Sequence, residues 1–130
     1  MSDRRPQCVY GVLVHQERVF LARYGDALGL PGGVFRPLAE DRKVELRGHL
    51  ADQLGIEARA IWGQGAFLYR HPSEERERFS GFYTVWEWTG DVATNEGEWL
   101  DSDRVSASEL PPSLRILLIS VLATLALRTT

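Results

Sequence analysis

The chain has 130 residues, of which 44% are hydrophobic and 25% are charged, and its formal net charge is -3. These proportions are typical of one globular domain with a packed core, so we expect a single domain over residues 1–130. The small negative charge offers no general means of holding a nucleic-acid backbone, and we expect no nucleic-acid polymer as a partner. The single cysteine, Cys8, excludes an internal disulfide, and the first residues lack the apolar run of a secretory signal. Both observations favour a cytoplasmic protein.

The first elements predict a hairpin followed by a glycine-rich loop. Residues 9–14 form an apolar run typical of a buried strand, and residues 18–23 form a second strand after a short connection. Residues 25–33 are rich in glycine and contain Pro31, which favours a loop at this point.

A helix is predicted from about residue 40 to residue 54, and Gly55 is placed to end it. Apolar residues recur about every fourth position of this helix, and we expect their stripe to face the core. The stripe consists of Val44, Leu46, Leu50, Ala51 and Leu54.

The other side of the same helix is polar. Glu45, His49, Asp52 and Gln53 are spaced so that their side chains can converge on one point, and Glu40 can reach the same region from the helix start. Any surface helix also shows polar residues opposite its apolar stripe, so the spacing by itself leaves simple solvation open as an explanation.

The middle of the chain predicts two strands joined by a charged loop. Residues 58–69 are typical of a strand with a possible break at Gly63 and Gly65. Residues 80–88 alternate small or polar residues with aromatic residues, which is also typical of a strand. Residues 70–78, with the sequence RHPSEERER, form the charged loop between them.

The last part of the chain predicts a polar turn at residues 90–97, a short strand at 98–100 and a helical turn at 106–110. A final helix follows Pro111, and its apolar run over residues 114–127 is too short to span a membrane. Because this run is apolar nearly all the way round, its helix needs cover on several sides, and a homodimer would supply part of that cover. Together these elements predict an α/β or α+β sandwich.

Residues 30–33, LPGG, and the helix after them resemble the Nudix box, the motif G-x5-E-x7-R-E-U-x-E-E-x-G-U of Nudix hydrolases, in which U is aliphatic. If the loop has one additional residue here, Glu40 falls on the first glutamate and Leu50 on the aliphatic position. In the same register, Gly55 and Ile56 fall on the closing pair.

The resemblance extends from about residue 9 to residue 127. VFLARYGDALGLPGG is similar to the family's second strand and its approach to the box, and EGEWLDSDRVSASELP is similar to its late E-x-W strand and the helical turn after it. The resemblance implies an α/β fold, namely a Nudix-like α/β/α sandwich with a mixed central sheet in a single domain.

The box departs from the family pattern. Its four glutamates correspond here to Glu40, His49, Asp52 and Gln53, and the Arg-Glu pair is replaced by Gly48-His49. Without the additional loop residue, Arg47 would fall on the family arginine, but the other key positions would be lost. Two of the four box glutamates are therefore replaced by residues without a carboxylate, and a third is shortened to aspartate.

The resemblance implies recognition of a nucleoside diphosphate linked to another moiety. A Nudix enzyme holds Mg²⁺ on its box glutamates and hydrolyses a pyrophosphate, so hydrolysis here is expected to be weakened or altered, with Mg²⁺ or Mn²⁺ held weakly. The expected metal ligands are Glu40, Glu45, His49 and Asp52, and the expected catalytic residues are Glu40, Asp52 and Glu98. The competing hypothesis is a catalytically inactive Nudix-fold regulator that binds a nucleotide-like ligand or a protein partner. A dimeric scaffold without a ligand is a third hypothesis.

Other polar residues are candidates with two interpretations each. Arginines suit phosphate because their planar group forms paired hydrogen bonds, but a single arginine is more often a solvated surface charge. The expected substrate-binding residues are Arg23, Gly32, Gly33 and Arg36, with Arg70 and Arg78 as further arginine candidates. Glu96 and Glu98 precede Trp99, and we favour Glu98 because it belongs to the strand. His15 and His71 have no ligand-like spacing and are expected at the surface.

Overall fold

The structure, a computed structural model, describes residues 6–36, 41–92 and 97–128. The elements in chain order are β1 (Cys8–His15), β2 (Arg18–Tyr24), β3 (Ala27–Gly29), β4 (Gly32–Val34), α1 (Arg42–Leu54), β5 (Glu57–Tyr69), β6 (Arg78–Thr89), β7 (Gly97–Leu100), α2 (Ser102–Ala107) and α3 (Pro112–Arg128).

A mixed sheet forms the middle layer, with β1 near its centre. The strand order is β3-β2-β1-β6-β5, while β4 also pairs with β1 and β7 also pairs with β2. The β1–β6 pair is parallel, whereas β1–β4, β1–β2 and β5–β6 are antiparallel. The predicted mixed central sheet is therefore confirmed.

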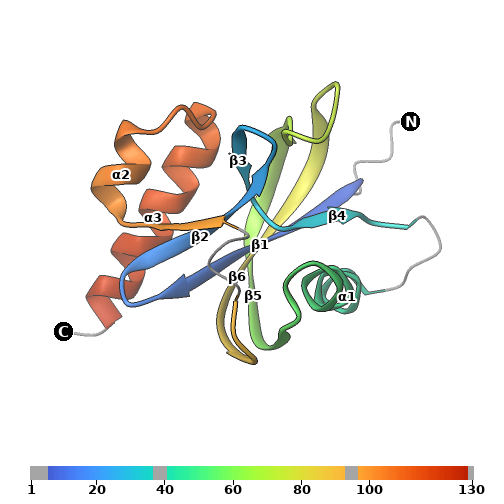
Figure 1. The fold of residues 1–130 in the computed structure, drawn as a ribbon, viewed down its shortest axis with the longest axis horizontal. Helices are drawn as coiled ribbons and strands as arrows, with labels where there is room; N and C mark the ends of the chain where they lie inside the picture. The colour runs from blue at the N-terminus through green and yellow to red at the C-terminus, as the bar shows by residue number, and fades with distance from the viewer. Residues whose placement is uncertain (1–5, 37–40, 93–96, 129–130) are drawn as a thin grey trace.

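Helices cover both faces of the sheet, with α1 on one side and α2 and α3 on the other (Figure 1). Two hydrophobic clusters match these two faces. On the α1 face, Leu46 and Leu50 pack with Val9, Leu13 and Phe20. The α3 face is larger, and its buried residues include Tyr10, Val12, Phe82, Leu114, Leu118 and Val121. The α/β/α sandwich predicted from the sequence is thus the observed architecture.

Helix α1 begins and ends at recognisable capping residues. The Oδ1 atom of Asp41 accepts a hydrogen bond from the Lys43 amide at 2.8 Å, so the helix begins at Arg42, later than the predicted start near residue 40. Gly55 ends it, as predicted, with a left-handed φ of 69° and an amide that donates to the Ala51 carbonyl.

The predicted core stripe of α1 is only partly correct. Leu46, Leu50 and Leu54 are buried, but Val44 is 58% exposed and Ala51 is also exposed. The reason is a rotation of the helix that brings Glu45, only 8% exposed, against the segment around β4. A polar row therefore flanks the leucines on one side, and Val44 and Ala51, on the other side of the stripe, face solvent.

Several predicted boundaries differ from the structure. The expected loop at residues 25–33 contains β3 and part of β4, because its backbone pairs with β2 and β1. The helical turn predicted at 106–110 is wrong: α2 ends at Ala107, and it begins after Asp101, whose side chain accepts from the Arg104 amide. The expected break in residues 58–69 is a register shift between Gly63 and Gly65 within the continuous strand β5.

The final helix α3 begins at Pro112, directly after Pro111, in agreement with the sequence. None of the helices in the described part of the chain is long and apolar enough to cross a membrane.

Candidate functional site

The glycine turn at residues 30–33 lies between the centre of the sheet and α1. Gly32 pairs with Tyr10 of β1, and the Gly11 amide donates to the Pro31 carbonyl at 2.9 Å. The φ of Gly32 is 143°, and a Cβ atom there would collide with the Val9 carbonyl and the Tyr10 backbone. Only glycine fits this position, because the strand and the turn approach each other so closely.

Gln53 of α1 binds both backbone groups of Gly32. Its Nε2 donates to the Gly32 carbonyl at 2.7 Å, and its Oε1 accepts from the Gly32 amide at 3.1 Å. An amide side chain is required for this pair, since a carboxylate has no hydrogen to offer the carbonyl. The replacement of the last box glutamate by glutamine thus matches its surroundings.

His49 lies one turn earlier and contacts the next part of the same segment. Its Nε2 is 2.9 Å from the Val34 carbonyl oxygen. Because a carbonyl only accepts, Nε2 must carry the hydrogen, which leaves Nδ1 as the ring nitrogen that keeps the lone pair. The ring lies over Gly33, where a Cβ atom would come within 3.0 Å of the imidazole.

Glu45 lies one turn earlier again and is held by Arg36. The guanidinium Nε and Nη2 donate to Oε1 and Oε2 at 2.8 and 2.9 Å, and the Arg36 amide also donates to Oε1 at 3.2 Å. The Arg36 guanidinium lowers the pKa of the Glu45 carboxyl. Both oxygens of the carboxylate are therefore engaged, and its charge is compensated.

These three contacts form one repeating unit, which we call the α1–β4 clamp: Glu45, His49 and Gln53 with Arg36, Val34 and Gly32. Four residues of helix advance about 6 Å, and two residues of extended chain advance about 6.7 Å. Because the two repeats nearly match, every fourth helix residue meets every second residue of the segment.

The remaining sequence candidates lie apart from the clamp or outside the described residues. Asp52 is exposed on α1, and Glu40 and Glu96 lie outside the described residues. Glu98 of β7 forms ion pairs with Arg23 at 3.5 Å and Arg104 at 3.3 Å. Among the residues with described positions, no hydrogen bond or ion pair joins Glu98 to α1.

The donors that the described residues supply do not complete a magnesium site, and the candidate ligands Glu40 and Glu96 lie outside those residues. Of the two carboxylates in α1, Glu45 is held by a guanidinium and Asp52 is exposed, while Gln53 is neutral. Within the described ranges, no group of three or more His, Cys, Asp or Glu side chains is placed to hold a metal ion. Mg²⁺ requires several oxygen ligands in near-octahedral geometry, and the clamp uses its own oxygen atoms for internal hydrogen bonds.

His71 was predicted at the surface, and this is wrong, because its side chain is only 2% exposed. Nε2 is 3.0 Å from the Leu30 carbonyl, and Nδ1 accepts from the Ser73 amide at 3.1 Å. The ring stacks on Tyr10 with centroids 5.1 Å apart, and burial lowers its pKa. The glycine turn is thus held from a second side by a buried neutral imidazole. The sequence signal was the short H-P-S turn, which lets Ser73 bind the ring.

Comparisons with known proteins identify the fold. Neither the protein-family models nor the curated proteins give a match to the chain. Among solved structures, a Mutator MutT protein from Bacillus halodurans has a TM-score of 0.72 and 17% identity, covering 91% of this chain and 82% of that one. The E. coli ORF135 protein has a TM-score of 0.68 and 23% identity over 93% of this chain and 91% of that one. The MutT NUDIX hydrolase from Burkholderia pseudomallei has a TM-score of 0.67 and 19% identity over 87% of this chain and 95% of that one.

The chain therefore has the fold of the MutT and Nudix hydrolases, in agreement with the resemblance seen in its sequence. At these identities the comparisons show the fold alone. Nudix hydrolases generally use divalent metal ions.

Proposed function

We propose that this protein recognises a nucleotide-like ligand through a Nudix fold whose box helix has become a clamp for the glycine turn. The observation that carries the proposal is the α1–β4 clamp, in which Glu45, His49 and Gln53 each bind the segment from Gly32 to Arg36. The second hypothesis from the sequence, a catalytically inactive regulator, thus becomes the preferred one.

Electrostatics support a binding role without hydrolysis. Metal-assisted attack on a diphosphate needs a cation that neutralises the phosphate oxygens and activates water. A cation bound at Glu45 would first have to displace the Arg36 guanidinium, which donates two charge-assisted hydrogen bonds. The side chains of α1 thus retain the shape of the Nudix box without the negative charge that a metal ion needs.

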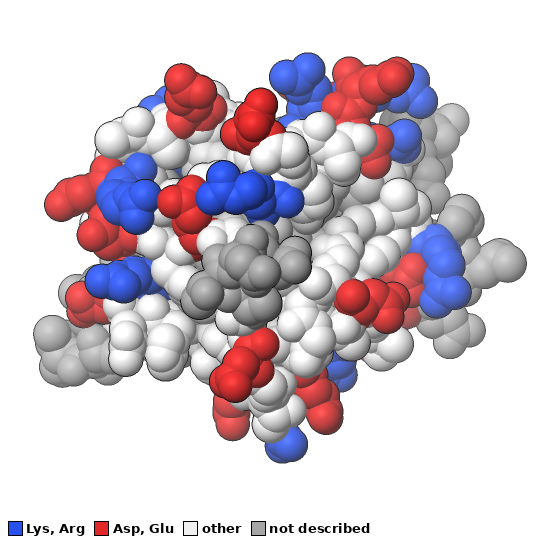
Figure 2. Space-filling model, in the orientation of Figure 1, with Lys and Arg blue, Asp and Glu red and all other residues white. Residues whose placement is uncertain are grey.

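Exposed arginines support an anionic ligand such as a diphosphate. The side chain of Arg36 is 77% exposed, and Glu45 engages only its Nε and Nη2, so Nη1 remains for a phosphate oxygen. Arg23, whose side chain is 49% exposed, is a second cation on the surface. Basic and acidic side chains are interspersed on the face shown in Figure 2, which is in line with a small ligand rather than a nucleic-acid polymer.

The second candidate is a weakened pyrophosphohydrolase that uses Mg²⁺ or Mn²⁺. The exposure of Asp52 on α1 favours it, since this carboxylate faces solvent, where a hydrated cation has access. The candidate needs Glu40 and Glu98 to complete the site. It predicts that Glu40→Gln or Asp52→Asn abolishes turnover.

The two candidates separate in one experiment. A panel of nucleoside diphosphates and nucleoside diphosphate sugars is incubated with the protein and Mg²⁺ or Mn²⁺. Release of phosphate or mononucleotide is followed by phosphorus NMR, and ligand binding is followed by thermal shift. We expect stabilisation by an intact nucleotide, with or without metal, and no release. Metal-dependent release that is lost in Asp52→Asn would replace the proposal with the hydrolase, and indifference to every nucleotide would leave a scaffold.

A charge control makes the binding test specific. Arg36→Gln is expected to weaken nucleotide binding at least about tenfold, which corresponds to about 1.4 kcal/mol. Arg47→Gln removes the same charge from an exposed position of α1 outside the clamp and is expected to leave binding unchanged. Equal effects of both variants would indicate nonspecific attraction of the anion.

We also propose that the chain forms a homodimer. Strand β5 lies at the edge of the sheet and carries Leu68, which is 58% exposed. On α3, Ile116 is 67% exposed. Exposed apolar residues and an edge strand are common features of subunit interfaces. Light scattering at micromolar concentration tests this, and a monomer would contradict it.

A further inference from the structure

A small cavity lies between strands β5 and β6 and helix α3, on the face of the sheet opposite α1. Its volume is about 190 Å³. It is lined by Trp62, Gly63, Gln64, Thr84, Trp86, Val121, Thr124 and Leu125. Since no residue of the glycine turn or of α1 belongs to this lining, the cavity is separate from the α1–β4 clamp.

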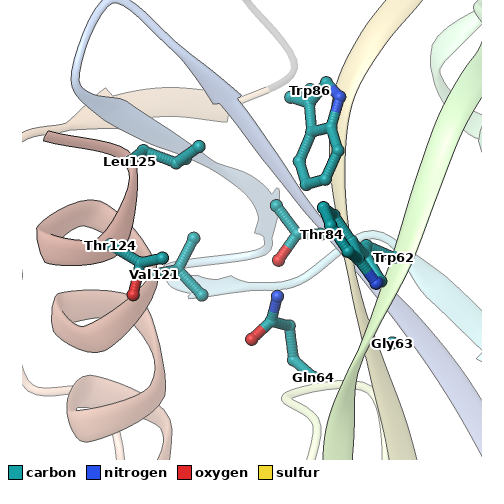
Figure 3. Close-up of a pocket in the computed structure, with 8 residues that line it drawn as sticks. All are labelled: Trp62, Gly63, Gln64, Thr84, Trp86, Val121, Thr124 and Leu125. Atoms are coloured by element: carbon teal, nitrogen blue, oxygen red, sulfur yellow. The ribbon is translucent and has the colours of Figure 1, made fainter. Parts of the chain in front are cut away.

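Thr84 gives the cavity a polar group that the fold leaves unsatisfied. The residue is 1% exposed, and its Oγ1 has no hydrogen-bond partner among the described residues. In Figure 3 this hydroxyl points into the open space in which the Gln64 amide also ends. A buried hydroxyl without a partner destabilises a protein, so such a group marks a place where an external partner is favourable.

The walls of the cavity are apolar and aromatic. The rings of Trp62 and Trp86 meet edge to face, with centroids 5.0 Å apart and an interplanar angle of 64°. Val121 and Leu125 of α3 lie across from them (Figure 3). None of the lining residues is ionisable, so the cavity offers no charge to a phosphate or a carboxylate.

Size and chemistry together define the occupant. Pockets for drug-sized ligands measure about 300–1,000 Å³, so a cavity of about 190 Å³ suits one small ring system and not a whole nucleotide. The hydroxyl and the amide can each donate and accept a hydrogen bond. Aromatic walls favour a flat ring, and this pair of polar groups favours an adjacent donor and acceptor on it.

We propose that this cavity binds a small, neutral, planar heterocycle with a lactam-type N–H and C=O, held by Thr84 and Gln64 between the tryptophan wall and α3. The proposal goes beyond nucleotide recognition and does not depend on it, because the two sites lie on opposite faces of the sheet.

The test compares two probes of the same shape. 2-Quinolinone carries a lactam in a fused two-ring frame, and naphthalene has the same frame without polar groups. Binding to the full chain is measured by ligand-observed NMR. We expect 2-quinolinone to bind at least about tenfold more tightly than naphthalene. Equal affinities would overturn the proposal because the polar pair would then contribute nothing, and no binding of 2-quinolinone would overturn it by leaving the cavity to water.

Substitutions at Thr84 assign the contact. Thr84→Val keeps the shape and removes the hydroxyl, so the preference for 2-quinolinone over naphthalene is expected to fall about tenfold, whereas Thr84→Ser is expected to retain it. Thr84→Val is also expected to unfold at the same temperature as the wild type or a higher one, because it removes a hydroxyl that has no internal partner. A lower unfolding temperature, or an unchanged preference, would contradict the assignment.

A second pair of variants tests the location without touching the sheet. Thr124→Leu adds bulk at the cavity, and Ser120→Leu adds the same side chain one turn earlier on α3, at an exposed position outside the lining. We expect Thr124→Leu to weaken 2-quinolinone binding at least about tenfold and Ser120→Leu to leave it unchanged. Equal behaviour of the two variants would place the probe elsewhere.

Discussion

The glycine turn is held from two sides that differ in kind. On the α1 side, the clamp uses several polar contacts that are partly buried or exposed. On the other side, one buried imidazole, that of His71, binds the Leu30 carbonyl inside an aromatic group that includes Tyr10 and Tyr24. The buried contact of His71 therefore contributes most to the stability of the turn, whereas the contacts on the α1 side determine which ligands the site can bind.

The largest expected effect comes from Gly32, which Gln53 binds from α1 and which lies tightly against β1. Gly32→Ala puts a Cβ atom against the Val9 carbonyl at a φ of 143°, and we expect a loss of at least about 3 kcal/mol in the free energy of unfolding. Urea unfolding measures it. In Gly33→Ala the three atoms nearest the new methyl group all belong to the His49 ring, which can shift, so this control is expected to lose far less. Similar losses would mean that the turn is not held tightly against β1.

Removing the buried contact of His71 is expected to lower the free energy of unfolding by less than Gly32→Ala does. His71→Phe keeps the ring but loses the hydrogen bonds to Leu30 and Ser73, and we expect a loss of about 2 kcal/mol in the free energy of unfolding. His15→Phe is the matched control at an exposed position and is expected to change stability by less than about 0.5 kcal/mol.

The same histidine predicts a dependence of stability on pH. Burial lowers the pKa of His71 in the folded protein, so the unfolded chain binds a proton first as the pH falls below about 6.5. The contribution of neutral His71 is complete above that pH. It declines on acidification by at most about 1.4 kcal/mol per pH unit. Urea unfolding from pH 7.5 to 5 should therefore show the wild type losing its advantage over His71→Phe, and a constant difference would contradict a neutral buried imidazole.

The sequence predicts those parts of the fold that depend on residues a few positions apart. The strand at residues 9–14, the leucines Leu46 and Leu50, and the helix end at Gly55 were predicted correctly, because hydrophobic repeats and capping residues act within a few positions. The short strands β3 and β4 were missed, because three-residue strands are defined by backbone pairing and not by side-chain alternation.

The site was harder to predict because its contacts are distant in sequence. The burial of His71 depends on the Leu30 carbonyl, 41 residues away, and the rotation of α1 depends on where β4 lies. Three of the polar residues of α1 bind the protein's own backbone or Arg36. Their roles as metal ligands stay predictions.

On the exposed side of the comparison, Gln53→Glu is expected to cost about 1 kcal/mol. The carboxylate can still accept from the Gly32 amide, but it cannot donate to the Gly32 carbonyl and places negative charge beside it. Asp52→Asn, the reverse exchange at the neighbouring exposed position, is expected to change stability by less than about 0.5 kcal/mol. If Gln53→Glu were as stable as the wild type, the amide pairing would not explain why glutamine stands at this position.

The smallest expected effect is a gain in the free energy of unfolding. Gly48 lies within α1 between the clamp residues Glu45 and His49, and a Cβ atom there would meet nothing within 4 Å. Alanine has a higher helix propensity than glycine, so Gly48→Ala is expected to raise the free energy of unfolding by about 0.5–1 kcal/mol. Because the added methyl group contacts neither the segment nor the core, nucleotide binding is expected to stay unchanged. Thermal unfolding and the binding assay check both parts. A gain in stability that weakened binding would show that the clamp works only on a helix that can deform at Gly48, and the exposed side would then owe its function to flexibility as well as to its hydrogen bonds.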